Sequence, residues 1–138
     1  MSLLDYVSCH TGKELVSIGP DANRRAFVRE FTVQNRSTVP GGFLDMTTSH
    51  CISLVNNLDP KANGLTTVCS TKDSDGDVLY TNFSGDGKGN SQAGSVIGTG
   101  KYEGVERIAK STLIGEFPLV KPGDYSRCLH FKGTYKLK

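Results

Sequence analysis

The sequence lacks tryptophan and carries little net charge, and these two features exclude whole classes of function. Its 138 residues include 16 basic and 14 acidic side chains, which gives a formal charge of +2, and only 8% of residues are aromatic. Nucleic-acid-binding domains concentrate positive charge and often stack bases on aromatic rings. We therefore expect no nucleic-acid partner and no electrostatic attraction to an anionic membrane.

Long hydrophobic runs are also missing. No apolar stretch approaches the ~20 residues that a membrane-spanning helix needs, so we expect no membrane span. The opening MSLLDYVSCH lacks the basic segment and apolar core of a signal peptide. We expect residues 1–8 to be a flexible or cloning-derived N-terminus, with any export leader already removed.

Helical periodicity is nearly absent, and alternation of apolar and polar residues dominates instead. In a strand, successive side chains point to opposite faces. In the segment GGFLDMTTSHCISLVNN, the face assigned to the core carries Leu44, Met46, Thr48, His50, Ile52 and Leu54. In YSRCLHFKGTYKLK, the core face carries Tyr125, Arg127, Leu129, Phe131, Tyr135 and Leu137. Both segments are predicted to be strands.

Similar runs at about 14–19, 24–38, 64–73, 77–84, 91–98 and 107–117 bring the total to about eight strands. Glycine- and proline-rich turn segments separate them, and strands joined by short loops pair antiparallel. We predict one all-β domain over residues 1–138, a single closed antiparallel barrel of about eight strands. Closure removes exposed sheet edges. A two-sheet β-sandwich is the alternative.

The four cysteines are the most informative part of the composition. Their number is even, and none forms a C-x-x-C pair. Widely spaced cysteines in even number are typical of disulfides formed in an oxidising compartment. We therefore expect a secreted or periplasmic protein.

Hairpin geometry predicts how the cysteines pair. Cys51 and Cys69 flank NNLDPKANG, and a loop centred near Pro60 would place them opposite each other, within disulfide range. Cys9 and Cys128 lie near the two ends of the chain. In a closed barrel the first and last strands pair, so a bridge between these two would join the seam. Four reduced thiols are the alternative.

The acidic stretch TKDSDGDVLY raises the question of a calcium loop. Counted from Asp73, an EF-hand would need glycine at the sixth position and glutamate at the twelfth, and the sequence has neither. Asp75-Gly76 between alternating runs predicts a type I′ hairpin turn. A surface cation site made by Asp73, Asp75 and Asp77 is the alternative.

The glycine-rich middle does not match a nucleotide-binding motif. Gly100-Lys101 is followed by Tyr102 rather than serine or threonine, and no helix is predicted after the glycines. We therefore expect no cofactor and no resident metal. Glycines at bends of a curling barrel explain the segment better.

Three residues are candidates for a ligand pocket inside the barrel: His50, Arg127 and Tyr80. His50 and Arg127 fall on predicted core faces, where a few oriented polar groups can line a barrel mouth. Hydrogen-bonded structural residues are the alternative interpretation. No G-x-S-x-G motif or other catalytic constellation is present, so no catalytic residue is assigned.

Residues 65 to 138 resemble a known family. The segments CSTKDSDGDVLYTNFSGDGKGN, GTGKYEGVERIAKS and FKGTYKLK are similar to those of exported, mostly uncharacterised bacterial proteins with an allene oxide cyclase-like, calycin-like β-barrel. The resemblance implies a small, exported, closed barrel. Plant cyclases of that fold act on an oxidised fatty acid inside the barrel, but their catalytic residues do not map onto positions here.

Taken together, these features favour a binding role over an enzymatic one. We expect the barrel to bind a small apolar ligand or to act as an interaction module. The alternative is an isomerase or cyclase that acts on a hydrophobic, oxidised fatty acid-like substrate. Convergent ionisable groups in a wide interior would favour the enzyme, whereas an interior filled with side chains would favour a structural role.

Overall fold

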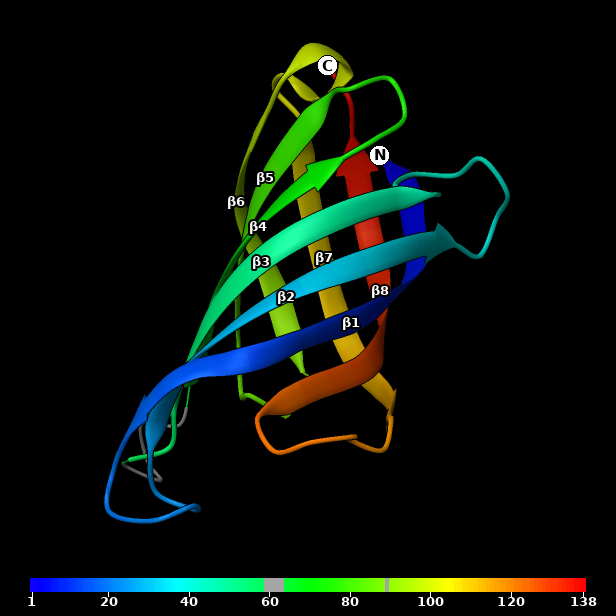
Figure 1. Ribbon diagram of the computed structural model, residues 1–138. Helices are drawn as coiled ribbons and strands as arrows, with labels where there is room; N and C mark the ends of the chain where they lie inside the picture. The colour runs from blue at the N-terminus through cyan, green and yellow to red at the C-terminus, as the bar shows by residue number, and fades with distance from the viewer. Residues whose placement is uncertain (59–63, 89) are drawn as a thin grey trace.

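Eight antiparallel strands, each paired with the next along the chain, form a closed barrel in the computed structural model (Figure 1). The structure describes residues 1–58, 64–88 and 90–138. The strands are β1 (Ser2–Ile18), β2 (Ala26–Ser37), β3 (Thr47–Asn56), β4 (Gly64–Lys72), β5 (Val78–Gly85), β6 (Ser91–Gly98), β7 (Glu106–Glu116) and β8 (Asp124–Lys136). Among the described residues, the helical content is one 3₁₀ turn, Gly100–Tyr102, and no helix long enough to cross a membrane occurs there.

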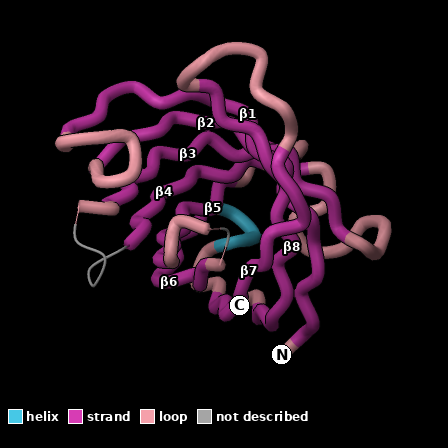
Figure 2. Tube along the Cα trace, turned by 90° about the horizontal axis from the view of Figure 1, so that it is seen from below, coloured by secondary structure: helices cyan, strands magenta, loops and turns pink. Residues whose placement is uncertain are grey.

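The barrel closes by pairing its first and last strands. β1 and β8 are in register from Ser2 opposite Tyr135 to Lys13 opposite Asp124. Viewed along the barrel, the strands form a continuous ring, and both termini lie at the same end of it (Figures 1 and 2). Neither β1 nor β8 is left as an open sheet edge. The predicted closed barrel is confirmed, and the sandwich alternative is wrong.

The N-terminal residues belong to the barrel wall. β1 begins at Ser2, and Leu4 and Tyr6 are each only 2% exposed because their side chains point into the interior. The expectation of a flexible segment over residues 1–8 is therefore wrong. The strand predicted over 14–19 is only the final part of β1, whose inward positions become polar at Ser8 and His10.

Alternation holds on β3, but its inner and outer faces are the reverse of the prediction. Cys51 is 1% exposed, whereas Ile52 and Leu54 are half exposed on the outer surface. Inward hydroxyls on β3 hydrogen-bond to hydroxyls of β4: Ser49 to Thr71 over 2.7 Å and Ser53 to Thr67 over 2.6 Å. The interior is polar along this strand, so hydropathy alone points to the wrong face.

Apolar side chains fill the end of the barrel where the termini lie. The loop between β2 and β3 contributes Leu44, which is 4% exposed and has a left-handed backbone with φ of 63°. Tyr102 and Val105 from the β6–β7 connection belong to the same buried cluster. Packing of these side chains holds Leu44 in a conformation that a non-glycine residue rarely adopts.

The β4–β5 connection is a hairpin, as predicted, but with a different turn. Gly76 has a φ of 87° and its amide donates to the Asp73 carbonyl over 3.1 Å, whereas Asp75 does not have positive φ. The Asp73 amide donates in turn to the Asp77 carbonyl, also over 3.1 Å. A three-residue loop with glycine in the left-handed position replaces the predicted two-residue turn.

Both predicted disulfides are present. Cys9–Cys128 joins β1 to β8 across the seam, at positions that are directly opposite in the register. Cys51–Cys69 joins β3 to β4, also at opposed positions, and lies in the interior. The predicted loop centre at Pro60 lies outside the described residues.

We expect the seam disulfide to contribute more stability than the internal one. In the chain-entropy model the effect grows with loop length, and the sequence separations are 119 and 18 residues. The double variant C9A/C128A should lose about 5 kcal/mol of unfolding free energy, and C51A/C69A about 3 kcal/mol plus a smaller cavity term. Urea titration monitored by circular dichroism measures both unfolding free energies. A loss below about 1 kcal/mol in C9A/C128A would contradict a stabilising role for the Cys9–Cys128 disulfide.

Candidate functional site

A cavity inside the barrel is the candidate site. Its volume is about 40 Å³, where one water needs about 10–15 Å³. Its wall combines aromatic rings, hydroxyls and the side chains of Arg29, Arg107 and Arg127. These arginines are 8%, 6% and 4% exposed. A narrow space with three buried cations is unusual, because arginine is rarely buried without a partner.

Arg29 and Arg127 lie on either side of Tyr125 near the starts of β2 and β8. The guanidinium carbon of Arg29 is 3.9 Å from the centre of the Tyr125 ring, and that of Arg127 is 5.0 Å away. Arg127 Nε donates to the Tyr125 hydroxyl. His10 completes the group, with Nδ1 3.1 Å from the same hydroxyl and its ring stacked on Phe31. We call Arg29, Arg127, Tyr125 and His10 the Tyr125 cluster.

Arg107 occupies a separate aromatic environment near the start of β7. Its guanidinium carbon lies 5.3 Å from the Tyr6 ring, 5.4 Å from Phe83 and 5.9 Å from Phe131. One terminal nitrogen donates to the Tyr6 hydroxyl. We call Arg107, Tyr6, Phe83 and Phe131 the Arg107 cluster. It shares no ring with the cation–π contacts of the Tyr125 cluster.

The positive charge in the cavity is not balanced by acidic groups. No aspartate or glutamate occurs among the described residues that line it. Glu14 and Glu116 favour the charged form of Arg29 from outside the cavity, and the Glu14 carboxylate is bound to Arg25. Within the described part of the chain, Nε of Arg29 and Nε of Arg107 are buried without a hydrogen-bond partner. Such donors are costly to leave unpaired.

Burial and like charge keep His10 neutral. Desolvation, followed by the positive charges of Arg127 and Arg29, lowers the pKa of His10 to about 3. Burial raises the pKa of the Tyr125 hydroxyl, although the two arginines oppose it. Burial also lowers the pKa of Arg29, but an arginine starts so high that it stays charged at neutral pH. The cluster therefore presents two cations beside two neutral rings.

A second set of interior polar groups is already paired. Ser8 donates to Asn35 Oδ1 over 2.5 Å, and the Asn35 amide donates to Thr47 and Ser49 over 3.2 and 3.1 Å. Ser49 continues the chain to Thr71. These side chains fix the packing of β1 to β4 across the interior. Because their hydrogen bonds are made within the protein, we assign the binding chemistry to the arginine clusters instead.

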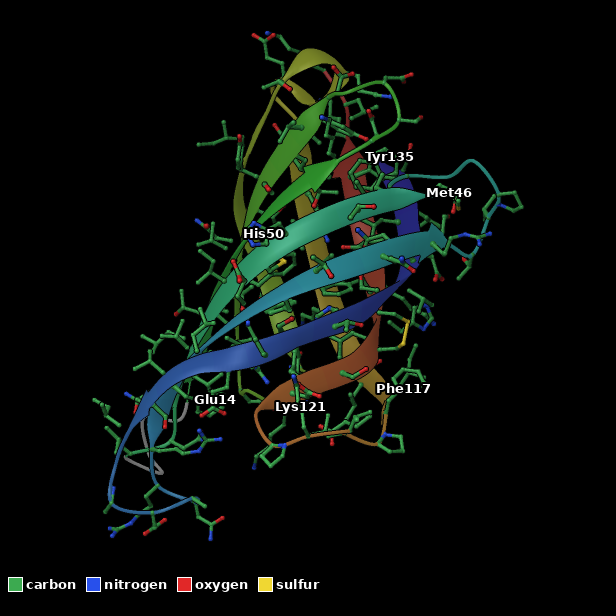
Figure 3. The ribbon with its side chains drawn as sticks, viewed as in Figure 1. Glu14, Met46, His50, Phe117, Lys121 and Tyr135 are labelled. Atoms are coloured by element: carbon green, nitrogen blue, oxygen red, sulfur yellow. A yellow bond between two sulfur atoms is a disulfide. The ribbon has the colours of Figure 1, made fainter. Side chains whose placement is uncertain are left out.

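The structure places one of the three predicted pocket residues inside the barrel. Arg127 lines the cavity, although its binding role stays a prediction. His50 lies on the outside of β3, with its side chain 55% exposed and paired with Glu30 over 2.9 Å (Figure 3). Tyr80 is 47% exposed on the outside of β5. The interior placement of both is wrong because the face of β3 was reversed and β5 directs Leu79 and Thr81 inward.

Sequence reasoning missed His10, Arg29, Arg107 and Tyr6 as cavity residues. Each alternates with outward residues on its strand, and Arg29 shares its face with Phe31 and Val33. The sequence signal for an inward arginine is its position two residues from an apolar residue on the same face of the strand. Hydropathy does not assign the inward faces of β1, β2 and β7, because polar and charged side chains occupy inward positions on each of these strands.

The three aspartates of the β4–β5 hairpin are engaged by other protein groups. Lys101 Nζ lies 2.8 Å from Asp73 and 2.7 Å from Asp75, and the Lys101 amide donates to Asp77. Burial opposes ionisation of Asp73, but hydrogen bonds from Lys101 and Tyr102 lower its pKa overall. No group of three potential metal ligands occurs among the described residues. The geometry therefore gives the cation-site alternative no support.

Comparison with known proteins leaves the family of the chain open. No protein-family model matches the sequence. No curated protein matches it either. The functional assignment therefore proceeds from the geometry of the cavity.

The low pKa of His10 predicts that the folded protein loses stability at pH values above those at which carboxylates titrate. Below pH 6.5 the unfolded chain protonates this histidine, while the folded chain resists until about pH 3. Stability should therefore fall by about 2 kcal/mol between pH 6.5 and 4.5. The variant H10N should lose this component. Urea unfolding at several pH values tests it, and parallel curves for the two proteins would contradict the burial of a neutral His10.

Proposed function

We propose that this protein binds a small organic anion inside its barrel. The observation that carries the proposal is the presence of three buried arginines around one cavity whose described lining residues include no carboxylate. An anionic group would accept hydrogen bonds from the guanidinium groups and neutralise part of their charge. Binding is the primary role that we propose.

Magnitudes argue that the aromatic contacts alone do not stabilise these arginines. A cation–π contact contributes about 0.5–2 kcal/mol, whereas removing an ion from water costs several kcal/mol even after relaxation. Hydrogen bonds to the Tyr6 and Tyr125 hydroxyls offset only part of the difference. A bound anion supplies the missing compensation, which is why a binding site explains the arrangement better than a structural role.

The cavity wall also indicates what kind of anion fits. Phe31, Phe83 and Phe131 present ring surfaces beside the arginines, and ring surfaces pack well against hydrocarbon. The volume of about 40 Å³ has room for about three waters, so a ligand the size of a short-chain carboxylate must also displace side chains of the wall. The expected apolar ligand is thus revised to a small amphipathic anion, such as a short-chain carboxylate.

Export to an oxidising compartment is part of the proposal. Two disulfides that use all four cysteines support a secreted or periplasmic location, where such bonds persist. Membership of the allene oxide cyclase-like barrels rests on the resemblance of residues 65 to 138. Neither point alters the binding chemistry, which depends only on the cavity.

A second candidate function is an isomerase or cyclase. The feature that favours it is the Tyr125 hydroxyl, which lies between Arg127 and His10 and remains protonated because burial raises its pKa. A protonated hydroxyl can donate to a developing oxyanion. Incubation with an epoxy fatty acid and chromatography of the products tests this candidate, and loss of turnover in Y125F would be required to sustain it.

We expect a measurable affinity for short carboxylates that depends on Arg127. Isothermal titration calorimetry with hexanoate and hexan-1-ol should show binding of the acid and much weaker binding of the alcohol. R127Q should weaken hexanoate binding by about 10- to 100-fold, the value of a charge-assisted hydrogen bond.

The matched control is R24Q. Arg24 lies in the β1–β2 loop with its side chain 60% exposed, so its loss should leave hexanoate binding unchanged. Circular dichroism checks that each variant keeps its strands. Equal binding of acid and alcohol, or an R127Q variant that binds like the wild type, would contradict the proposal.

A further inference from the structure

We infer that the ligand carries two anionic groups, one for each arginine cluster, joined by a short apolar segment. The inference rests on the proposed binding of an organic anion and specifies its chemical class as a short α,ω-dicarboxylate. It follows from the separation of the two clusters, from one unpaired donor in each, and from a wall between them whose polar side chains are already paired.

The two clusters occupy different parts of the cavity. β2 and β8 start at the end of the barrel opposite the termini, whereas β7 starts at the end where the termini lie (Figure 1). Arg29 and Arg127 lie near the starts of β2 and β8, and Arg107 is the second residue of β7. The cation–π and hydrogen-bond contacts that hold Arg107 involve Tyr6, and those that hold Arg127 involve Tyr125.

Each cluster has a buried donor without an acceptor. Nε of Arg29 belongs to the Tyr125 cluster and Nε of Arg107 to the Arg107 cluster, and neither has a partner among the described residues. A ligand with one anionic group would satisfy one of these donors and leave the other buried and unpaired. A ligand with an acceptor at each end satisfies both, and so avoids the penalty of a desolvated donor.

The wall between the clusters combines aromatic rings with polar side chains that already have hydrogen-bond partners. Phe83 packs against the buried residues of both hydrophobic clusters of the barrel, and its ring contacts Phe131 with centres 5.5 Å apart. The hydroxyl and amide side chains that also line the cavity hydrogen-bond within the protein: Ser8, Asn35, Ser49, Ser53, Thr67, Thr71 and Ser91. The middle of the ligand therefore meets ring surfaces and polar groups that already have partners, which favours an apolar segment there.

The volume favours carboxylates over larger anions at the two ends. A carboxylate is planar and accepts two parallel hydrogen bonds from one guanidinium. A carboxylate has three non-hydrogen atoms and a phosphate has five, so a carboxylate requires the smaller displacement of the wall around a cavity of about 40 Å³. A methylene chain of a few carbons is the narrowest connection between two such groups.

Calorimetry with three matched probes tests the inference on the wild-type protein at a fixed ionic strength near 0.15 M. The probes are α,ω-dicarboxylates of four to eight carbons, their monomethyl esters, and monocarboxylates with the same number of carbons. The best dicarboxylate should bind at least 10-fold tighter than its monomethyl ester, which has the same length and one charge fewer. The preference should peak at one chain length, because the two arginine clusters are fixed in the wall.

Arginine variants test whether the second carboxylate of the ligand binds at Arg107. R107Q should reduce the affinity for the best dicarboxylate by 10-fold or more and change the affinity for its monomethyl ester by less than 3-fold. R107K keeps the charge and guards against simple loss of folding, so it should retain part of the preference for the dicarboxylate. R24Q is the surface control and should behave as the wild type.

The outcomes separate the two proposals. Equal affinity for dicarboxylate and monomethyl ester in the wild type overturns the dianion and leaves the binding of an organic anion intact. The same conclusion follows if R107Q lowers both affinities equally. No binding of any carboxylate overturns both the dianion and the proposed function.

Discussion

The pairing of β1 with β8 is the constraint on which the rest of the structure depends. It turns a meander of strands into a closed ring, and the Cys9–Cys128 bridge lies across the seam where the two strands are opposite each other. Inward side chains of all eight strands then share one interior that excludes most water. A charged group in that interior must find its partners there, because the wall separates it from bulk solvent.

This enclosure makes the arginines informative. On an open sheet face, Arg29 and Arg127 would be ordinary solvated residues, but inside the barrel they are almost fully buried and close to the same Tyr125 ring. Their charge also acts on a neighbour, since it helps burial to keep His10 neutral. The interior therefore holds a fixed excess of positive charge at neutral pH, and this excess, not the shape of the cavity, is the basis for the negative sign of the proposed ligand.

The fold was predictable from the sequence, whereas the site was predictable only in part. Alternation, turn residues and cysteine spacing are local signals, and they were sufficient for the strands, the closure and both disulfides. Hydropathy does not reveal which face of β3 points into the barrel. Its inward Ser49 and Ser53 carry hydroxyls, whereas its outward Ile52 and Leu54 are apolar. That reversal placed His50 in the interior and Cys51 outside, although the predicted Cys51–Cys69 pair does not depend on which face it occupies.

The failure of the hydropathy signal coincides with the candidate functional site. A barrel that needed only stability would fill its interior with aliphatic side chains, as its apolar end does with Leu4, Leu79 and Leu129. Here the remaining interior carries hydroxyl pairs and arginines, which stabilise the empty barrel less than hydrocarbon would. Local patterns that disagree with the fold are concentrated where a protein departs from maximal stability. On this argument the two unpaired Nε donors are the least explained groups in an empty barrel and the best explained ones in a barrel that holds an anion.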